Sequence, residues 1–485
     1  MLSIQNTFSE RSKWINARSS TIFPIYLNKN NDQILVFQNY WKWKSKIKDL
    51  KFILTLRDED SKIINQIKYS VKTHNELSVK KIFNLKKNFT GQLECEIESN
   101  KNLKFPYPAL MMFYRNVNGF ESVVHSAGRH LNSNEKISSK FYESNFKCFF
   151  NDDFTPLIHI FSGSKINNKT NLILLSFYDK KNKIIFSKKL NTIFKKPFSS
   201  KIIFLDKILN KIEKKKIYKK NFFIKIKFDI PNIFGRLIVG NYDKKNDALF
   251  MTHTFRVHNS KNKNLITPHR KFKSTAYLPL MNFAPLKMKA VSYPTNANTK
   301  TPYNKYVFEK NKKTKIGSGL INTGGNKSKI FEVNQFDNNF KILEFKKSIP
   351  DRLNIEFNYS LENSRHPTDI ADGIKTCHQP KKFNHWGHGV SRKSFITYIF
   401  IANYSNLTKE LKNEKIQIDL FSNQKKIRKK INLESSSFKV IKFENLKDKI
   451  KSNYFSWKVI SKKANLNIYW VSFNKNGSIC GDHAF

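Results

Sequence analysis

Short apolar runs separated by polar turns recur along the whole chain and predict β-strands. Three such runs, at 34–37, 157–161 and 398–401, open segments that resemble one another. Each is followed by an apolar strand, an Asp- or Asn-centred turn and a second strand that begins with Lys and Ile, which is typical of a β-hairpin. The three predicted hairpins span 50–67, 171–190 and 415–433.

Each segment closes with a second predicted hairpin that runs into a histidine. Two of these hairpins turn at Asn-Gly, a strong hairpin signal because a type I′ turn needs positive φ at both central residues. The turns lie at Asn118-Gly119, near Asn246-Asp247 and at Asn476-Gly477, and the closing histidines are His125, His253 and His483. The similar length from opening strand to closing histidine indicates an internal repeat.

We therefore predict an all-β protein made of tandem antiparallel β-sandwich modules, with at least three repeats. The repeats occupy 20–130, 150–258 and 395–485. Between the second and third lies 259–394, which is rich in proline and contains a Gly-rich loop. We expect this segment to be a long irregular insertion, with a degenerate fourth module as the alternative.

The composition supports packed modules and puts nucleic acid low among the partners considered. Hydrophobic residues make up 39% of the chain and aromatic residues 14%, which is not the composition of a disordered protein. The net charge of +52 first points to nucleic acid or to an anionic ligand. However, the lysines are spread over the whole length, and Lys, Asn, Ile and Phe are over-used together, as an AT-rich genome imposes on any protein.

The sequence predicts a cytoplasmic protein without a membrane span. No apolar run reaches the roughly 20 residues that cross a bilayer, and no basic and apolar leader opens the chain. The four cysteines lie far apart and form no C-x-x-C pair, which argues against a disulfide framework and a thiolate zinc site.

The repeat histidines are the first candidates for ligand binding. In two copies a second histidine follows five residues later, and an arginine lies between the two. Residues five apart on a strand point to opposite faces, so one pair cannot chelate one ion unless the strand bends. The alternative is that the closing histidine is a structural strand residue. The ligand-binding candidates, with one tryptophan from the segment described next, are His125, Arg129, His253, Arg256, Trp386 and His483.

The second candidate site is the histidine-rich segment 366–389, which three glycines predict to be a loop. Imidazole and carboxylate groups are ligands for divalent transition metals, although no established metal-binding spacing is present. The alternative is an irregular loop whose histidines bond to the backbone. The candidate metal ligands are His366, Asp369, Asp372, His378, His385 and His388.

These observations leave the question of catalysis open and support three functions in order. The first is a non-catalytic repeat protein that binds a polar or glycan-like ligand or acts as a scaffold. The second is a metal-dependent enzyme that acts on a polar or anionic substrate through the 366–388 segment. The third is nucleic-acid binding driven by charge.

Overall fold

A computed structural model describes most of the chain as antiparallel β-sheet with five short helices. None of these helices is long and apolar enough to cross a membrane. The described residues are 20–44, 46–99, 109–126, 128–130, 142–163, 171–179, 183–192, 194, 196–228, 233–234, 236–257, 265–266, 276–292, 300–309, 312–322, 330–332, 339–345, 349–350, 355–372, 375–376, 383–404, 413–462 and 466–485.

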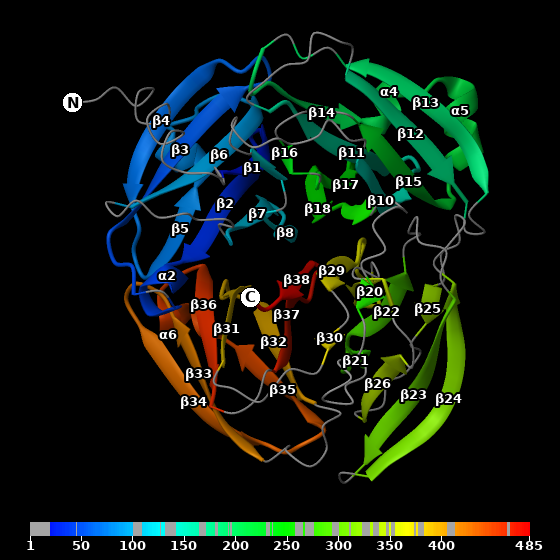
Figure 1. Cartoon of the computed structure of the whole chain (residues 1–485). Coiled ribbons are helices and arrows are strands. Elements are labelled where there is room, and N and C mark those ends of the chain that lie inside the picture. The colour runs from blue at the N-terminus through cyan, green and yellow to red at the C-terminus, as the bar shows by residue number, and fades with distance from the viewer. Residues whose placement is uncertain are drawn as a thin grey trace. The chain divides into compact units, whose positions relative to one another are not determined.

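The chain forms two compact units, and each unit contains two sandwich modules (Figure 1). Unit 1 is Met1–Arg256 and holds modules 1 and 2, whereas unit 2 is Val257–Phe485 and holds modules 3 and 4. Each module pairs a four-stranded sheet with a second sheet of four or more strands. This confirms the predicted all-β class of tandem antiparallel sandwiches and gives four modules.

Unit 1 is built from four sheets. In module 1 the larger sheet has the order β16-β9-β1-β6-β3-β4 and the smaller sheet β5-β2-β7-β8; in module 2 the orders are β13-β12-β15-β10-β19 and β14-β11-β17-β18. The strands are β1 (Ser20–Leu27), β2 (Asn31–Gln38), β3 (Leu50–Asp58), β4 (Ile63–Ser70), β5 (His74–Ser78), β6 (Phe89–Ser99), β7 (Met111–Asn116), β8 (Glu121–His125), β9 (Gly128–His130), β10 (Tyr142–Phe149), β11 (Phe154–Phe161), β12 (Asn171–Tyr178), β13 (Ile184–Thr192), β14 (Ser200–Phe204), β15 (Asn221–Phe228), β16 (Ile233–Phe234), β17 (Ile238–Asp243), β18 (Ala248–His253) and β19 (Phe255–Val257). The helices are α2 (Tyr40–Lys44), α3 (Val79–Ile82), α4 (Leu205–Ile208) and α5 (Lys211–Ile217).

Unit 2 repeats this plan. In module 3 the sheet orders are β24-β23-β26-β21-β30 and β25-β22-β28-β29, and in module 4 they are β31-β36-β33-β34 and β35-β32-β37-β38. The strands are β20 (Leu265–Ile266), β21 (Ala276–Leu280), β22 (Lys287–Ser292), β23 (Lys300–Glu309), β24 (Lys312–Asn322), β25 (Ile330–Glu332), β26 (Phe340–Phe345), β27 (Ile349–Pro350), β28 (Ile355–Ser360), β29 (Thr368–Asp372), β30 (Lys375–Thr376), β31 (Phe383–Val390), β32 (Phe395–Asn403), β33 (Glu414–Phe421), β34 (Lys426–Leu433), β35 (Ser437–Glu444), β36 (Tyr454–Ser461), β37 (Asn467–Asn474) and β38 (Ile479–His483). Its helix is α6 (Leu446–Ile450), and β20 pairs with β27 as a separate two-stranded sheet.

The four modules end in the same way. In each module the sheet given second above ends in an edge strand, namely β8, β18, β29 or β38. After this strand the chain crosses to the other sheet of the module. There β9 pairs with β1, β19 with β10 and β30 with β21. In module 4 Phe485 takes this place, because it exchanges two backbone hydrogen bonds with Trp386 of β31, of 3.1 and 2.9 Å.

Alternation of apolar and polar residues creates the two faces of each sheet. In β33 Ile416, Ile418 and Leu420 are all buried. Lys415, which precedes Ile416 and points to the opposite face, is exposed. Side chains on a strand alternate between faces, so this sequence can bury one face only in this register. Burying these side chains contributes about 1.5–3 kcal/mol each to folding.

The segment 259–394 contains three full sheets, the two of module 3 and the two-stranded β20–β27 sheet, and also the first strand of module 4. Its histidine-rich part, predicted as a loop, includes strands β29, β30 and β31. The glycines that suggested a loop have another use in β31. Gly387 and Gly389 leave space that the rings of Trp457 and Phe455 on the paired strand β36 occupy.

We expect Gly387→Ala to destabilise unit 2, because the added Cβ would collide with the buried Trp457 ring. Forcing an extra methyl into a packed core costs about 1–3 kcal/mol. Gly317→Ala in β24 is the matched control, since a Cβ there meets nothing within 4 Å. Urea unfolding of the full chain, followed by tryptophan fluorescence, should shift to a lower midpoint for Gly387→Ala alone; equal midpoints for both variants would contradict this packing.

Candidate functional site

Two of the three closing histidines meet where modules 1 and 2 adjoin. The rings of His125 in β8 and His253 in β18 lie 4.5 Å apart between centroids, at 70° to each other. The Nδ1 atom of His253 lies 3.0 Å from the carbonyl oxygen of Thr254. A carbonyl only accepts hydrogen bonds, so Nδ1 carries the proton and donates. The packing of modules 1 and 2 therefore brings two of the repeat histidines into contact within unit 1.

Strands β8 and β18 are held side by side by a hydroxyl group. The Ser122 Oγ donates to the carbonyl of Leu249 at 2.6 Å and accepts from the backbone N–H of Met251 at 3.1 Å. Ser122 is buried, so both bonds form away from competing water. This hydroxyl fixes the register of the two strands although they belong to different sheets.

A carboxylate next to this contact joins the two modules. Asp247 lies in the β17–β18 turn of module 2 and accepts hydrogen bonds from two amides of module 1. The Nδ2 atoms of Asn28 and Asn30 donate to its two carboxylate oxygens, each at 3.0 Å. Tyr242 donates to the same group at 2.8 Å. Hydrogen bonds to a charged acceptor are stronger than neutral ones, so this turn is firmly held on module 1.

Aromatic rings pack beside Tyr242, whose hydroxyl donates to Asp247. Tyr26 of module 1 packs edge to face against Tyr242 and Phe204 of module 2, with centroids 6.0 and 5.5 Å apart. Burial and then the hydrogen bond to Asp247 raise the pKa of Tyr242. Its hydroxyl therefore remains a hydrogen-bond donor throughout the neutral pH range.

Unit 2 contains the equivalent junction, in which β38 of module 4 lies against β29 of module 3. Again the turn of the second module's last hairpin rests on the first module, and Asn363 donates to the carbonyl of Lys475 at 2.9 Å. The chain register also corresponds. Asp372 is the last residue of β29 and pairs with Ile355 of β28, and His483 is the last residue of β38 and pairs with Tyr469 of β37. Asp372 therefore occupies in module 3 the position of His483 in module 4.

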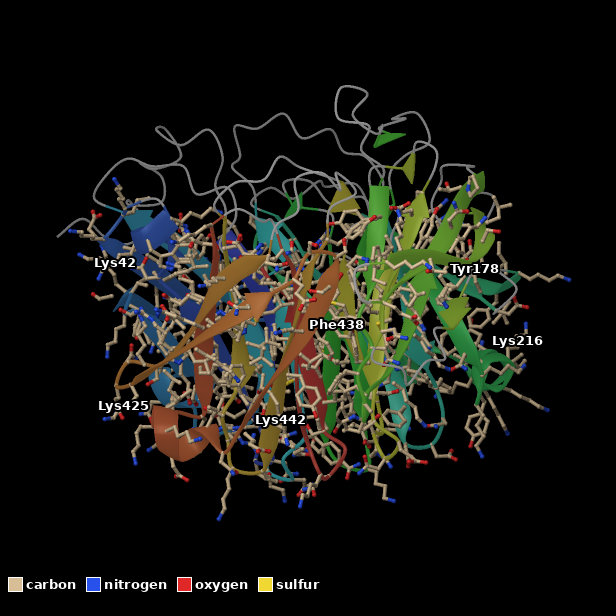
Figure 2. The ribbon with its side chains drawn as sticks, turned by 90° about the horizontal axis from the view of Figure 1, so that it is seen from below. Lys42, Tyr178, Lys216, Lys425, Phe438 and Lys442 are labelled. Carbon is tan, nitrogen blue, oxygen red and sulfur yellow. The ribbon has the colours of Figure 1, made fainter. Side chains whose placement is uncertain are left out.

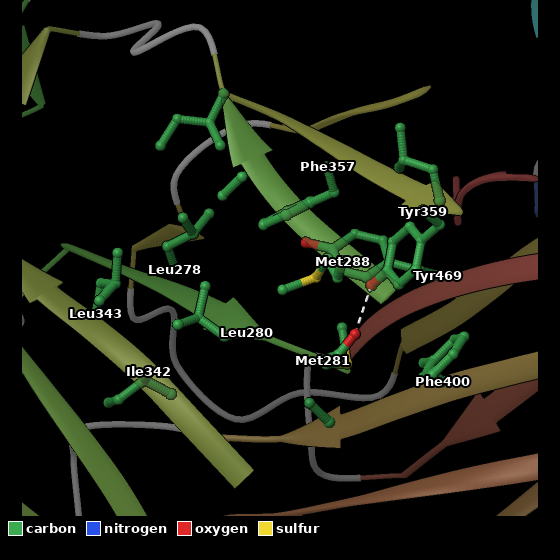
Figure 3. Packing of buried hydrophobic residues seen from close by; sticks show 14 of the residues in the cluster. Leu278, Leu280, Met281, Met288, Ile342, Leu343, Phe357, Tyr359, Phe400 and Tyr469 are labelled. Carbon is green, nitrogen blue, oxygen red and sulfur yellow. Dashed lines mark hydrogen bonds between the residues drawn. The ribbon is translucent and has the colours of Figure 1, made fainter. Parts of the chain in front are cut away.

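The modules of unit 2 share an aromatic core (Figure 3), and a carboxylate also joins them, because the Tyr404 hydroxyl of module 4 donates to Glu344 of module 3. Phe357 and Tyr359 of module 3 pack against Tyr469 and Phe400 of module 4, with ring centroids 5.4 and 5.7 Å apart. The Tyr359 hydroxyl donates to the carbonyl of Met281 at 2.6 Å, which satisfies its polar atom inside the core. One hydrophobic cluster thus continues from module 3 into the outer face of module 4.

The candidate ligands in β31 are part of the folded sheet. His385 and His388 are three residues apart on a strand and point to opposite faces. The Nε2 of His385 accepts from the backbone N–H of Leu466 at 3.2 Å, and the Nδ1 of His388 lies 3.1 Å from the Ser456 hydroxyl. Trp386 stacks on Phe485, with ring centroids 4.8 Å apart.

The remaining candidates are dispersed or only partly described. The Nδ1 of His366 lies 2.7 Å from the carbonyl of Pro367, and Asp369 accepts from Asn358 at 2.6 Å. His483 repeats the arrangement of His253, since its Nδ1 lies 2.8 Å from the carbonyl of Ala484. Outside the described part are His378 and the side chains of Arg129, Arg256 and Asp372. Ligand and metal roles for these residues remain predictions.

Comparison with known proteins identifies no family. No protein-family model matches the chain, and no curated protein does. One solved structure, described as a crystal structure of a tetra-tandem repeat in the extending region of a large adhesion protein, aligns over 90% of this chain and 91% of its own. The two are 8% identical, and the TM-score of 0.11 is too low to carry an argument.

Burial also sets the protonation of groups outside the junctions. Burial raises the pKa of the Cys95 and Cys148 thiols, which removes them as nucleophiles at neutral pH. His74, the first residue of β5, is buried, and this desolvation lowers its pKa to about 4, although Glu76 nearby acts in the opposite direction.

We expect His74 to make unit 1 less stable in acid. An unfolded histidine has a pKa near 6.5, so the folded state binds fewer protons between about pH 6.5 and 4, and stability falls as the pH falls through that range. The full loss is about 3 kcal/mol. In urea unfolding of the full chain, the stability advantage of the wild type over His74→Gln should shrink between pH 7 and pH 4; an advantage of constant size would contradict the assignment.

Proposed function

We propose that the chain is a non-catalytic scaffold whose sandwich modules are held as rigid pairs. The observation that carries this proposal is the same docking in both units, where the last hairpin of the second module rests on the last hairpin of the first. A flexible string of domains needs no such contact. A scaffold that fixes the spacing of its modules does.

The roles of the candidate histidines agree with this proposal. His253 and His483 bond to the carbonyl of the next residue, and His385 accepts a backbone N–H. Groups used in this way support the fold. A polar or glycan-like ligand would then bind to the surface of the pairs.

Rigid pairing predicts a narrow distance between spin labels on modules 1 and 2. The labels are attached to cysteines introduced by Lys87→Cys and Lys189→Cys, both at exposed positions. The background carries Cys377→Ser, so that the other three cysteines of the chain are buried. We expect Asp247→Ala to broaden the distribution, because three donors lose their acceptor at a cost of about 1–3 kcal/mol. Asp60→Ala, an exposed aspartate of the same unit, is the control and should change nothing.

A broad distribution in the wild-type chain, equal to that of Asp247→Ala, would refute the rigid scaffold. A narrow distribution in all three proteins would instead show that the aromatic contacts of Tyr26 hold the modules without the carboxylate.

The metal-dependent enzyme is the second candidate, and metal analysis separates it from the scaffold. For the scaffold we expect the purified full chain to unfold at the same temperature with and without a strong chelator. A transition metal bound stoichiometrically to the wild-type protein, and lost in the double variant His385→Ala, His388→Ala, would favour the enzyme. Because both histidines are buried, far-ultraviolet circular dichroism must show that the double variant is still folded.

A further inference from the structure

The short helix α5 of module 2 presents a dense cluster of lysines to solvent. Asn210 and Glu213 form a capping box that fixes its first turn, and Ile217 anchors its inner side in the module core. The opposite side, with the residues that follow, is exposed (Figure 2, where Lys216 is labelled). We call this surface the α5 patch; it comprises Lys211, Ile212, Lys215, Lys216, Lys219 and Lys220.

Among the described residues, carboxylates offset little of the positive charge of the α5 patch. Burial acts to raise the pKa of Glu213, but Lys188 and, to a lesser extent, Lys216 lower it. The nearby carboxylates have other partners, since Glu213 pairs with Lys188 at 2.7 Å and Asp152 accepts from the Tyr218 hydroxyl. Within the described part of the chain, none of the five patch lysines forms a salt bridge to a carboxylate. The patch is therefore a concentrated source of positive potential.

Exposed aliphatic side chains lie in the α5 patch and on strand β13, whose Lys188 pairs with Glu213 of α5. Ile212 is 70% exposed, and Ile184 at the start of the neighbouring strand β13 is 57% exposed. Beneath them Lys216 lies 6.0 Å from the Phe186 ring centroid, and Lys219 lies 5.2 Å from that of Tyr218. A single exposed isoleucine is ordinary, but Ile212 lies within the lysine cluster, directly after Lys211 and three residues before Lys215.

We propose that the α5 patch docks module 2 on an anionic lipid bilayer. Lysine clusters attract the negative surface of such a bilayer, and aliphatic side chains enter the boundary between headgroups and acyl chains. A nucleic acid would use the lysines but would gain little from Ile212 and Ile184, because phosphate contacts are electrostatic. This inference goes beyond the scaffold and does not depend on it.

The expected binding is reversible and depends strongly on salt. A lysine close to an anionic surface strengthens binding about fivefold, and two turns of helix bury too little apolar surface for permanent anchoring. The full chain should therefore sediment with vesicles that contain about one part phosphatidylglycerol to three parts phosphatidylcholine, and not with phosphatidylcholine alone. Binding should weaken when salt is raised from about 0.1 M to 0.5 M.

A pair of matched variants separates the patch from the bulk charge. Lys215→Glu, Lys216→Glu, Lys219→Glu should weaken vesicle binding by at least about a hundredfold. The control is Lys425→Glu, Lys429→Glu, Lys430→Glu on the exposed β33–β34 hairpin, which changes the net charge equally and should lose less than about fivefold. Unchanged thermal unfolding establishes that both proteins are folded.

Ile212→Ser tests the apolar part without altering the charge. We expect it to weaken vesicle binding about five- to tenfold and to leave binding to duplex DNA unchanged. The proposal is overturned if wild-type protein does not bind anionic vesicles, or if both triple variants lose binding equally. It is also overturned if Ile212→Ser has no effect on vesicles, or if duplex DNA binds the patch more tightly than they do.

Discussion

The contact between the last strands of paired modules is the constraint on which the rest of the structure depends. Strands β8, β18, β29 and β38 are all edge strands of four-stranded sheets. An uncovered edge exposes unpaired N–H and C=O groups and invites pairing with other chains. Placing β8 against β18, and β29 against β38, covers these edges in pairs. The position of each hairpin turn, and of the groups that hold it, follows from this arrangement.

The two junctions reach one geometry with different chemistry. In unit 1 a carboxylate with three donors joins the modules beside a few aromatic contacts, whereas in unit 2 a continuous aromatic core does so with one carboxylate, Glu344, beside it. A net hydrogen bond contributes about 1 kcal/mol, and an aromatic pair contributes about 0.5–1.5 kcal/mol beyond its buried area. The energies are comparable, so the sandwich plan does not require a particular set of residues. The carboxylate contacts require specific orientations of Asp247 and Glu344, and the aromatic contacts require complementary shape.

The sequence predicted the fold class, whereas the contacts between modules could not be read from it. Three modules were recognisable in the sequence by hairpins that end in histidine, because turn residues and strand periodicity are local signals. Module 3 lacks both signals: a longer connection, 361–367, joins β28 to β29, and Asp372 replaces the histidine. The Asn28–Asp247 bond joins residues 219 positions apart, so no local pattern could reveal it. Gly387 and Gly389 suggested a loop, but they lie in strand β31, where they make room for aromatic rings of β36.

The large positive charge has a structural use on the edges that remain uncovered. The outer strands β4, β13, β24 and β34 carry one to four Lys or Arg residues each and no Asp or Glu. Lysine on an exposed edge opposes pairing with another copy, because two such edges repel each other. Charge placed in this way protects these sheet edges and accounts for ten of the 89 Lys and Arg residues. The α5 patch differs, because its lysines and the exposed Ile212 lie on a helix instead of a sheet edge, and repulsion between sheet edges gives no reason for that position.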